Sequence, residues 1–213
     1  MKRRTAGLMM AAVLAVAALA GCGGKVKFEP KASSIYVKKD GTVVSADIED
    51  FVGNNYSEAE LKTYVEDAVK EYNSEHGAGA EAYVDEEDED ASLPVQITSL
   101  TVEEGIASLF LEYEKCSDYL EFTGTSGTEG GVSRLELSTV GETSFSGNFQ
   151  NAKGEDVTQE GVTKKEKNSV VIIEGAVTVQ VEGNIQYVSA GAALVDKHTV
   201  TTQAGSVTYI VFK

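Results

Sequence analysis

Residues 57–77 read SEAELKTYVEDAVKEYNSEHG and carry the signals of one amphipathic helix. Ser57 precedes Glu60 by three positions, the capping-box spacing in which each side chain accepts a hydrogen bond from a free backbone N–H. Apolar residues then recur at helical spacing and predict one buried stripe: Leu61, Val65, Ala68 and Tyr72, with Tyr64 and Val69 beside them. Gly77 stands where a helix-ending residue is expected. The segment therefore predicts a helix with one face in the core.

A β-hairpin is predicted immediately before this helix. Residues 35–37 are apolar or aromatic, a Lys39-Asp40-Gly41 turn follows, and residues 42–51 continue as a second strand. Within that second strand, apolar and polar residues alternate: Val44, Ala46 and Ile48 are separated by Ser45 and Asp47. Alternation with a period of two is typical of a strand that presents different residues to its two faces.

The same order of elements recurs after the helix. Residues 95–102 and 106–113 predict a second hairpin, in which Leu109, Leu111 and Tyr113 share a face, and a short helix is predicted over about 115–122. Two strand-strand-helix units predict a four-stranded antiparallel sheet with both helices on one face. The first half of the chain, residues 33–123, is therefore expected to be an α+β portion (ββα ββα).

The second half of the chain differs in amino-acid composition and periodicity. Glycines at 127, 130 and 131 mark a connection, and residues 132–213 are rich in Ser, Thr, Val and Gly without a helical period. The run Val170-Val171-Ile172-Ile173 predicts a strand buried on both faces, and alternation continues around residues 177–181 and 207–212. We expect a β-rich portion here, either separate or continuous with the first as one domain.

Composition excludes one class of function. The chain has 213 residues, with 18 Lys plus Arg against 34 Asp plus Glu, a formal net charge of −16. Binding nucleic acid requires a basic face to neutralise phosphates, and no Lys/Arg-rich block is present. The 42% hydrophobic content is sufficient for a packed core.

The N-terminus carries an export signal. Lys2, Arg3 and Arg4 precede an apolar run over residues 6–20, which is shorter than the roughly 20 residues that a permanent membrane span needs. Residues 1–21 are therefore predicted to be a signal peptide that is removed.

The end of this signal, Leu19-Ala20-Gly21-Cys22, resembles the lipobox of bacterial lipoproteins in all four positions. The resemblance implies cleavage between Gly21 and Cys22 and attachment of a diacylglyceryl group, with acyl chains such as palmitate, to the Cys22 sulfur. It also implies an anchored protein on the extracytoplasmic face of the cell membrane, with residues 22–32 as a lipidated tether. In its signal and its lysine-rich start the chain is similar to uncharacterised lipoproteins of Gram-positive bacteria. An ordinary signal peptide with an accidental cysteine is the alternative.

Lysines follow the proposed anchor closely. Residues 23–39 contain five lysines against the single acid Glu29: Lys25, Lys27, Lys31, Lys38 and Lys39. A basic stretch beside a lipid anchor can lie on anionic head groups. The same lysines also suit a solvated tether and an edge strand, and the sequence favours neither interpretation.

The sequence offers two weak candidates for chemistry. Cys116 could be a nucleophile with His76 or His198 as its base, although a lone thiol is more often a small buried hydrophobe. The six consecutive acids at residues 85–90 could bind calcium through Asp85, Asp88 and Asp90, but they lack the glycine and spaced glutamate of an EF-hand loop. Such a run also suits a solvated loop.

No catalytic motif is present. The chain contains no Ser-x-x-Lys, Gly-x-Ser-x-Gly, His-Glu-x-x-His or Cys-x-x-Cys, and no cofactor is predicted. We therefore expect a non-enzymatic adaptor or binding module on the membrane, with its protein partner unidentified. The alternatives are a receptor for a solute or for calcium, and a carboxylate-dependent hydrolase of the cell envelope.

Overall fold

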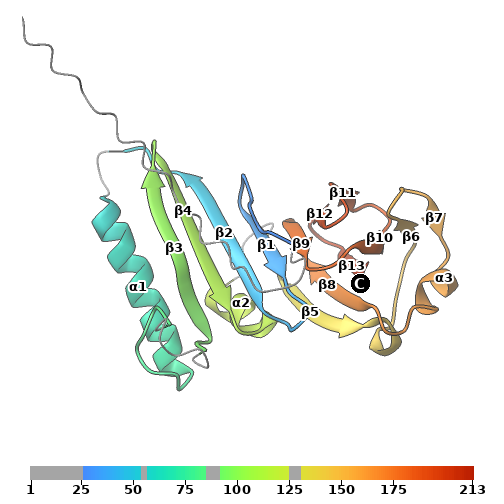
Figure 1. Cartoon of the computed structure of the whole chain (residues 1–213), viewed down its shortest axis with the longest axis horizontal. Coiled ribbons are helices and arrows are strands. Elements are labelled where there is room, and N and C mark those ends of the chain that lie inside the picture. The colour runs from blue at the N-terminus through green and yellow to red at the C-terminus, as the bar shows by residue number, and fades with distance from the viewer. Residues whose placement is uncertain (1–25, 54–56, 85–91, 125–130) are drawn as a thin grey trace, which may run out of the picture.

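The computed structural model describes residues 26–53, 57–84, 92–124 and 131–213 (Figure 1). Over these residues the fold is α+β and rich in strands, as predicted, and the strands form two sheets. The seven-stranded sheet has the order β11-β12-β9-β1-β2-β4-β3, and the six-stranded sheet has the order β5-β8-β13-β10-β6-β7.

The first half of the chain confirms both predicted hairpins. The strands of the four-stranded antiparallel part are β1 (Ser34–Val37), β2 (Val43–Asp50), β3 (Val95–Glu103) and β4 (Ile106–Tyr113). The central pairing joins β2 to β4, with Val43 opposite Tyr113 and Asp50 opposite Ile106. The two hairpins therefore meet through their second strands, because each second strand is the inner one.

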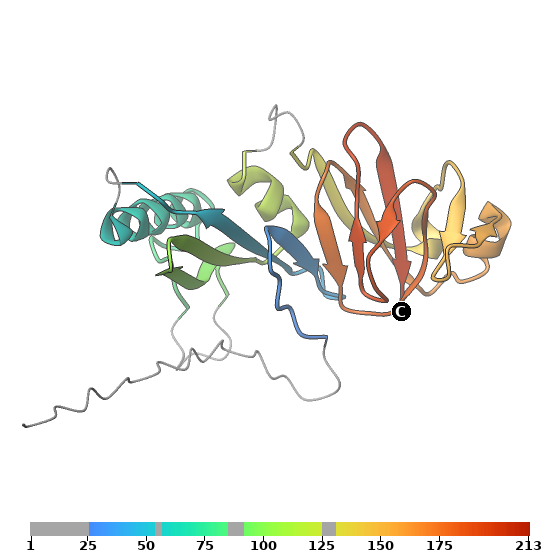
Figure 2. The ribbon, with the colours of Figure 1, turned by 90° about the horizontal axis from the view of Figure 1, so that it is seen from above.

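Both predicted helices are present and lie on one face of this sheet (Figure 2). Helix α1 (Glu58–Glu75) begins with the complete capping box: Ser57 Oγ accepts from the Glu60 N–H at 3.2 Å, and the Glu60 carboxylate accepts from the Ser57 N–H at 2.9 Å. Helix α2 (Cys116–Phe122) packs its Phe122 ring edge-on against Tyr72 of α1. The stripe of α1 reaches the core at Val65, Val69 and Tyr72, whereas Tyr64 is 75% exposed.

The six-stranded sheet is built from the second half of the chain. Its members are β5 (Arg134–Thr139), β6 (Phe149–Asn151), β7 (Asp156–Val157), β8 (Ser169–Glu174), β10 (Ile185–Ser189) and β13 (Val207–Phe212). Strand β8 is buried on both faces at residues 170–173, as predicted. In β13 the expected alternation is replaced by burial of nearly every residue, because the strand lies inside the sheet with both faces covered. A 3-10 turn, η1 (Val140–Glu142), and a short helix, α3 (Gln159–Thr163), are also present, although no helical period predicted them.

Three strands of the second half belong to the seven-stranded sheet: β9 (Thr178–Val181), β11 (Ala193–Leu194) and β12 (Thr199–Thr201). Strand β9 pairs in parallel with β1, placing Val179 beside Ile35. One hydrophobic core then draws on both sheets, including Val37 and Val181 from the first and Ile173 and Phe212 from the second. The two portions of the chain are thus joined by hydrogen bonds and by a common core.

A buried asparagine ties α1 to the start of β3. Asn73 is fully buried, and its side chain donates to the carbonyl groups of Glu81 and Val95, both at 2.7 Å, and accepts from the Val95 N–H at 3.0 Å. The two bonds to Val95 satisfy backbone groups on the outer edge of β3, which has no neighbouring strand on that side.

We expect Asn73→Ala to lower the free energy of unfolding by about 2–3 kcal/mol, because it leaves buried backbone groups without partners. Urea denaturation followed by circular dichroism measures the change. Ser74→Ala, at the exposed neighbouring position, is the matched control and is expected to stay near wild type. An Asn73→Ala midpoint equal to that of the control would contradict this role.

Candidate functional site

Several residues singled out by the sequence lie outside the described part of the chain. These are Gly21 and Cys22 at the proposed lipidation site, and Asp85, Asp88 and Asp90 in the acidic run. Within the described residues, no group of three or more His, Cys, Asp or Glu side chains is placed to hold a metal ion. No helix among those residues combines the length and apolarity needed to cross a membrane.

Neither His76 nor His198 is hydrogen-bonded to Cys116. Its Sγ lies 3.8 Å from the carbonyl oxygen of Gly41, and burial raises the pKa of the thiol to about 11. His76 bonds to the Tyr72 carbonyl and the Glu121 carboxylate, and His198 bonds to the Gly183 carbonyl. Burial thus favours the neutral thiol, and each histidine that the sequence offered as its base is hydrogen-bonded to other groups.

The register of the first sheet separates a helix-covered face from an opposite face. Ser45 pairs with Ile35 and Leu111, so it points toward the helices, and its hydroxyl lies 3.4 Å from that of Tyr113. Val44 pairs with Tyr36 and Glu112 and therefore belongs to the opposite face. Tyr36, Val44 and Ala46 are nonetheless buried, which requires a cover on the side without helices.

The cover is the segment from residue 26 to residue 30, here called the N-terminal strap. The ring of Phe28 stacks on Tyr36 with centroids 5.5 Å apart and meets Phe110 edge-on at 6.2 Å. Two hydrogen bonds hold its backbone: Tyr36 Oη donates to the Val26 carbonyl at 3.4 Å, and Gln180 Nε2 donates to the Lys27 carbonyl at 2.8 Å. Over these residues the expected tether is therefore held against the sheet.

The burial of Tyr36 also affects its acidity. Desolvation, followed by the nearby negative charges of Glu182 and Asp40, raises the pKa of the Tyr36 phenol to about 12. The hydroxyl thus remains protonated and continues to donate to the strap at physiological pH.

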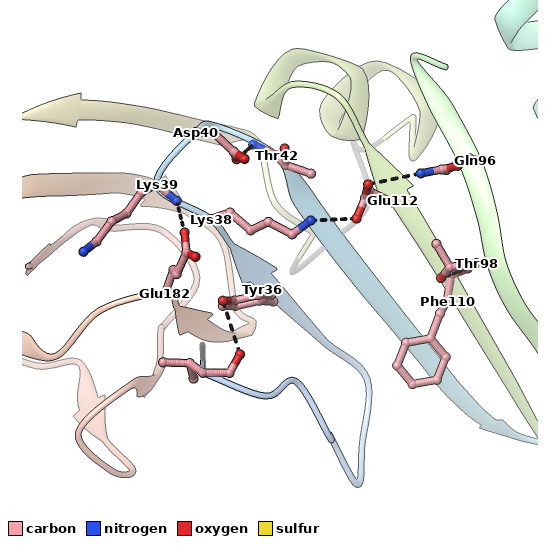
Figure 3. A network of polar contacts seen from close by, with 11 residues as sticks. Tyr36, Lys38, Lys39, Asp40, Thr42, Gln96, Thr98, Phe110, Glu112 and Glu182 are labelled. Atoms are coloured by element: carbon pink, nitrogen blue, oxygen red, sulfur yellow. Dashed lines mark hydrogen bonds and ion pairs between the residues drawn. The ribbon is translucent and has the colours of Figure 1, made fainter. Parts of the chain in front are cut away.

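A polar network lies beside the strap on the same face (Figure 3). Lys38 Nζ contacts the Glu112 carboxylate at 2.7 Å, and Gln96 donates to the other Glu112 oxygen at 3.1 Å. Nearby, the Lys39 N–H donates to the Glu182 carboxylate at 2.8 Å, which joins the first hairpin to the end of β9. Because each carboxylate accepts a hydrogen bond from another segment, the network fixes the strands relative to one another.

An open depression of about 490 Å³ lies where the strap begins. Its lining comes from segments far apart in the sequence: Val26, Lys27, Glu182, Gly183, Asn184, Lys197, His198 and Lys213. Nδ1 of His198 donates to the Gly183 carbonyl at 2.7 Å and orients the ring. Glycoside hydrolysis takes a pair of carboxylates, whereas among the described residues that line this depression the one carboxylate is that of Glu182.

A second polar cluster joins the end of α1 to α2. The His76 ring stacks on Tyr72 with centroids 3.9 Å apart, its Nδ1 donates to the Tyr72 carbonyl at 2.8 Å, and its Nε2 lies 3.2 Å from the Glu121 carboxylate. The bond to the Tyr72 carbonyl, together with Glu121, raises the pKa of His76 above its ordinary value. Protonated His76 therefore helps to close the C-terminal end of α1.

A raised pKa predicts a pH-dependent stability. The contribution of His76 is complete below the unfolded-state pKa, about 6.5, and is lost as the pH rises through the higher pKa of the folded state. Denaturation midpoints measured from about pH 5.5 to 8.5 are expected to fall less steeply in His76→Gln than in wild type. Glu121→Gln should show a smaller change in the same direction, and superimposable pH profiles for all three proteins would contradict the assignment.

The strap is the feature that inspection of the sequence missed. The sequence predicts only a tether over residues 22–32, yet Val26, Phe28 and Pro30 are half-buried while Lys27 and Glu29 are exposed. That alternation was a usable signal of an extended segment lying on a surface. The partners of the strap, Tyr36, Phe110 and Gln180, were not detectable because they belong to three different strands.

Comparison with protein-family models, with curated proteins and with solved structures finds no match to this chain.

Proposed function

We propose that this protein is a lipoprotein anchored to the extracytoplasmic face of the cell membrane through diacylglyceryl on Cys22, where it acts as a non-enzymatic adaptor or binding module. The observation that carries the proposal is the Leu19-Ala20-Gly21-Cys22 sequence at the end of an apolar export signal. Two acyl chains are sufficient for stable attachment, since each buried methylene contributes about 0.8 kcal/mol.

The strap is consistent with this function. Val26 lies four positions after Cys22, and four extended residues span at most about 14 Å. Because the strap is bonded to β1 and β9 from residue 26 onward, an anchor at Cys22 would hold the folded body close to the membrane. This arrangement suits a protein that presents a surface at the membrane rather than one that reaches far from it.

The described side chains favour binding over catalysis. Burial keeps the thiol of Cys116 protonated, and its sulfur lies 3.8 Å from the Gly41 carbonyl oxygen. The carboxylates of Glu112 and Glu182 are each bonded to a donor. What the fold offers instead is a broad sheet with two distinct faces.

Intact mass measurement of the protein expressed from its full sequence, in a bacterium that modifies lipoproteins, tests the proposal. We expect the mass of residues 22–213 plus that of the lipid, and incorporation of labelled fatty acid. A mature protein with an unmodified thiol at Cys22, or one that keeps residues 1–21, would refute the anchor.

A further inference from the structure

Three lysines from distant parts of the chain converge where the strap enters the fold. Lys27 lies on the strap, Lys197 in the loop between β11 and β12, and Lys213 directly after β13, and all three line the depression that contains Val26. Each of them is exposed. Figure 2 shows the strap and the end of β13 on the same side of the molecule, opposite the helices α1 and α2.

The charge of this region differs from that of the chain as a whole, which carries −16. Among the described residues, Lys197 and Lys213 form no ion pair, and Lys27 is joined only to the exposed Glu29 at 3.9 Å. The neighbouring acids are occupied by backbone donors: Glu182 accepts from the Lys39 N–H, and Asp196 accepts from the His198 N–H at 2.7 Å. The lysine ammonium groups are therefore available to an external anion.

An exposed apolar side chain accompanies the lysines. Val195 is 60% exposed and lies two positions from Lys197 in the same loop. That loop is tight, because the N–H groups of Val195 and Asp196 both donate to the Thr199 carbonyl, at 2.9 and 3.3 Å. Val195 and Lys197 are thus exposed in the same tight loop, and a surface that combines apolar and cationic side chains suits the interface of an anionic membrane.

We propose that Lys27, Val195, Lys197 and Lys213, here called the docking surface, rest on the anionic head groups of the membrane that holds Cys22. The inference depends on the proposed lipid anchor, which brings Val26 within about 14 Å of the lipid. That reach is an upper limit, and the lysines attract the head groups where they approach to within about one screening length, about 8 Å at physiological salt. Docking would direct the helix-covered face of the first sheet away from the membrane.

Tryptophan fluorescence of the lipidated full-length protein in vesicles tests this orientation, because the chain contains no tryptophan. Val195→Trp reports on the docking surface, and Val52→Trp, at an 80% exposed position after β2, is the matched control. In vesicles containing phosphatidylglycerol, we expect a blue shift and quenching by brominated lipid at position 195 only. In pure phosphatidylcholine vesicles we expect both effects at position 195 to be lost.

Charge reversal supplies the second arm. Lys197→Glu with Lys213→Glu in the Val195→Trp protein is expected to abolish quenching, whereas Lys153→Glu with Lys167→Glu, at exposed positions away from the depression, leaves it unchanged. Equal quenching at positions 52 and 195, or quenching that survives reversal of Lys197 and Lys213, overturns the proposal that the docking surface rests on the membrane.

The intact mass of each sample distinguishes failure of the lipid anchor from failure of docking. Absent lipid refutes the anchor and the inference that rests on it, and lipidated protein without quenching at position 195 refutes docking alone.

Discussion

Replacement of Cys22 by alanine is expected to abolish fatty-acid incorporation completely. The chain contains two cysteines, and a thioether-linked diacylglyceryl group requires a thiol. Cys116 cannot substitute for Cys22, because no apolar export signal or lipobox-like sequence precedes it. Loss of the Cys22 sulfur should therefore remove the lipid entirely rather than partially.

The matched control is Cys116→Ala, which removes the other thiol. This variant is expected to incorporate labelled fatty acid as wild type does, and its intact mass should differ only by the sulfur atom. Metabolic labelling followed by mass measurement of both variants gives a clear comparison. Label that persists in Cys22→Ala, or disappears from Cys116→Ala, would contradict the lipid attachment proposed for Cys22.

Phe212→Ala is expected to lower the free energy of unfolding by about 3–5 kcal/mol. The Phe212 side chain is fully buried in β13, within the core cluster that also contains Val37 of β1 and Val181 of β9. Its removal would leave a cavity at a point where both sheets contribute atoms, and a close-packed core collapses only partly around such a cavity.

Equilibrium unfolding in urea, followed by circular dichroism and by tyrosine fluorescence, measures this effect. Tyr64→Ala removes an aromatic side chain that is 75% exposed, and its stability should stay within about 0.5 kcal/mol of wild type. Because one core joins the two sheets, we expect the two probes to report a single transition in wild type. If Phe212→Ala lowers the free energy of unfolding no more than Tyr64→Ala does, the core is not continuous at Phe212.

The parts of the fold that the sequence predicted correctly are those governed by nearby residues. The capping box of Ser57 and Glu60, the end of α1 shortly before Gly77 and the two hairpins depend on contacts within a few positions along the chain. Such local preferences act on backbone hydrogen bonds and turn geometry directly, so they can be recognised without knowing the rest of the structure.

The parts that could not be predicted depend on residues far apart. The parallel pairing of β1 with β9 joins Tyr36 to Gln180, and nothing in either segment specifies the other. Helix α3 was missed because five residues are too short for a periodic signal, and it is held by Val162 in the second hydrophobic cluster. In both cases packing against the rest of the fold, not local preference, selects the conformation.

The same division applies to function. The sequence alone determined the candidate anchor, since Cys22 and the export signal before it are contiguous and are recognised as an extended chain before folding. Only the tertiary structure placed Lys27, Lys197 and Lys213 around one depression, and only it held the strap against Tyr36 and Phe110. The physical reason is that a surface is formed by side chains brought together when distant strands pair and bury a common core, and linear order records neither the pairing nor the face on which a side chain emerges.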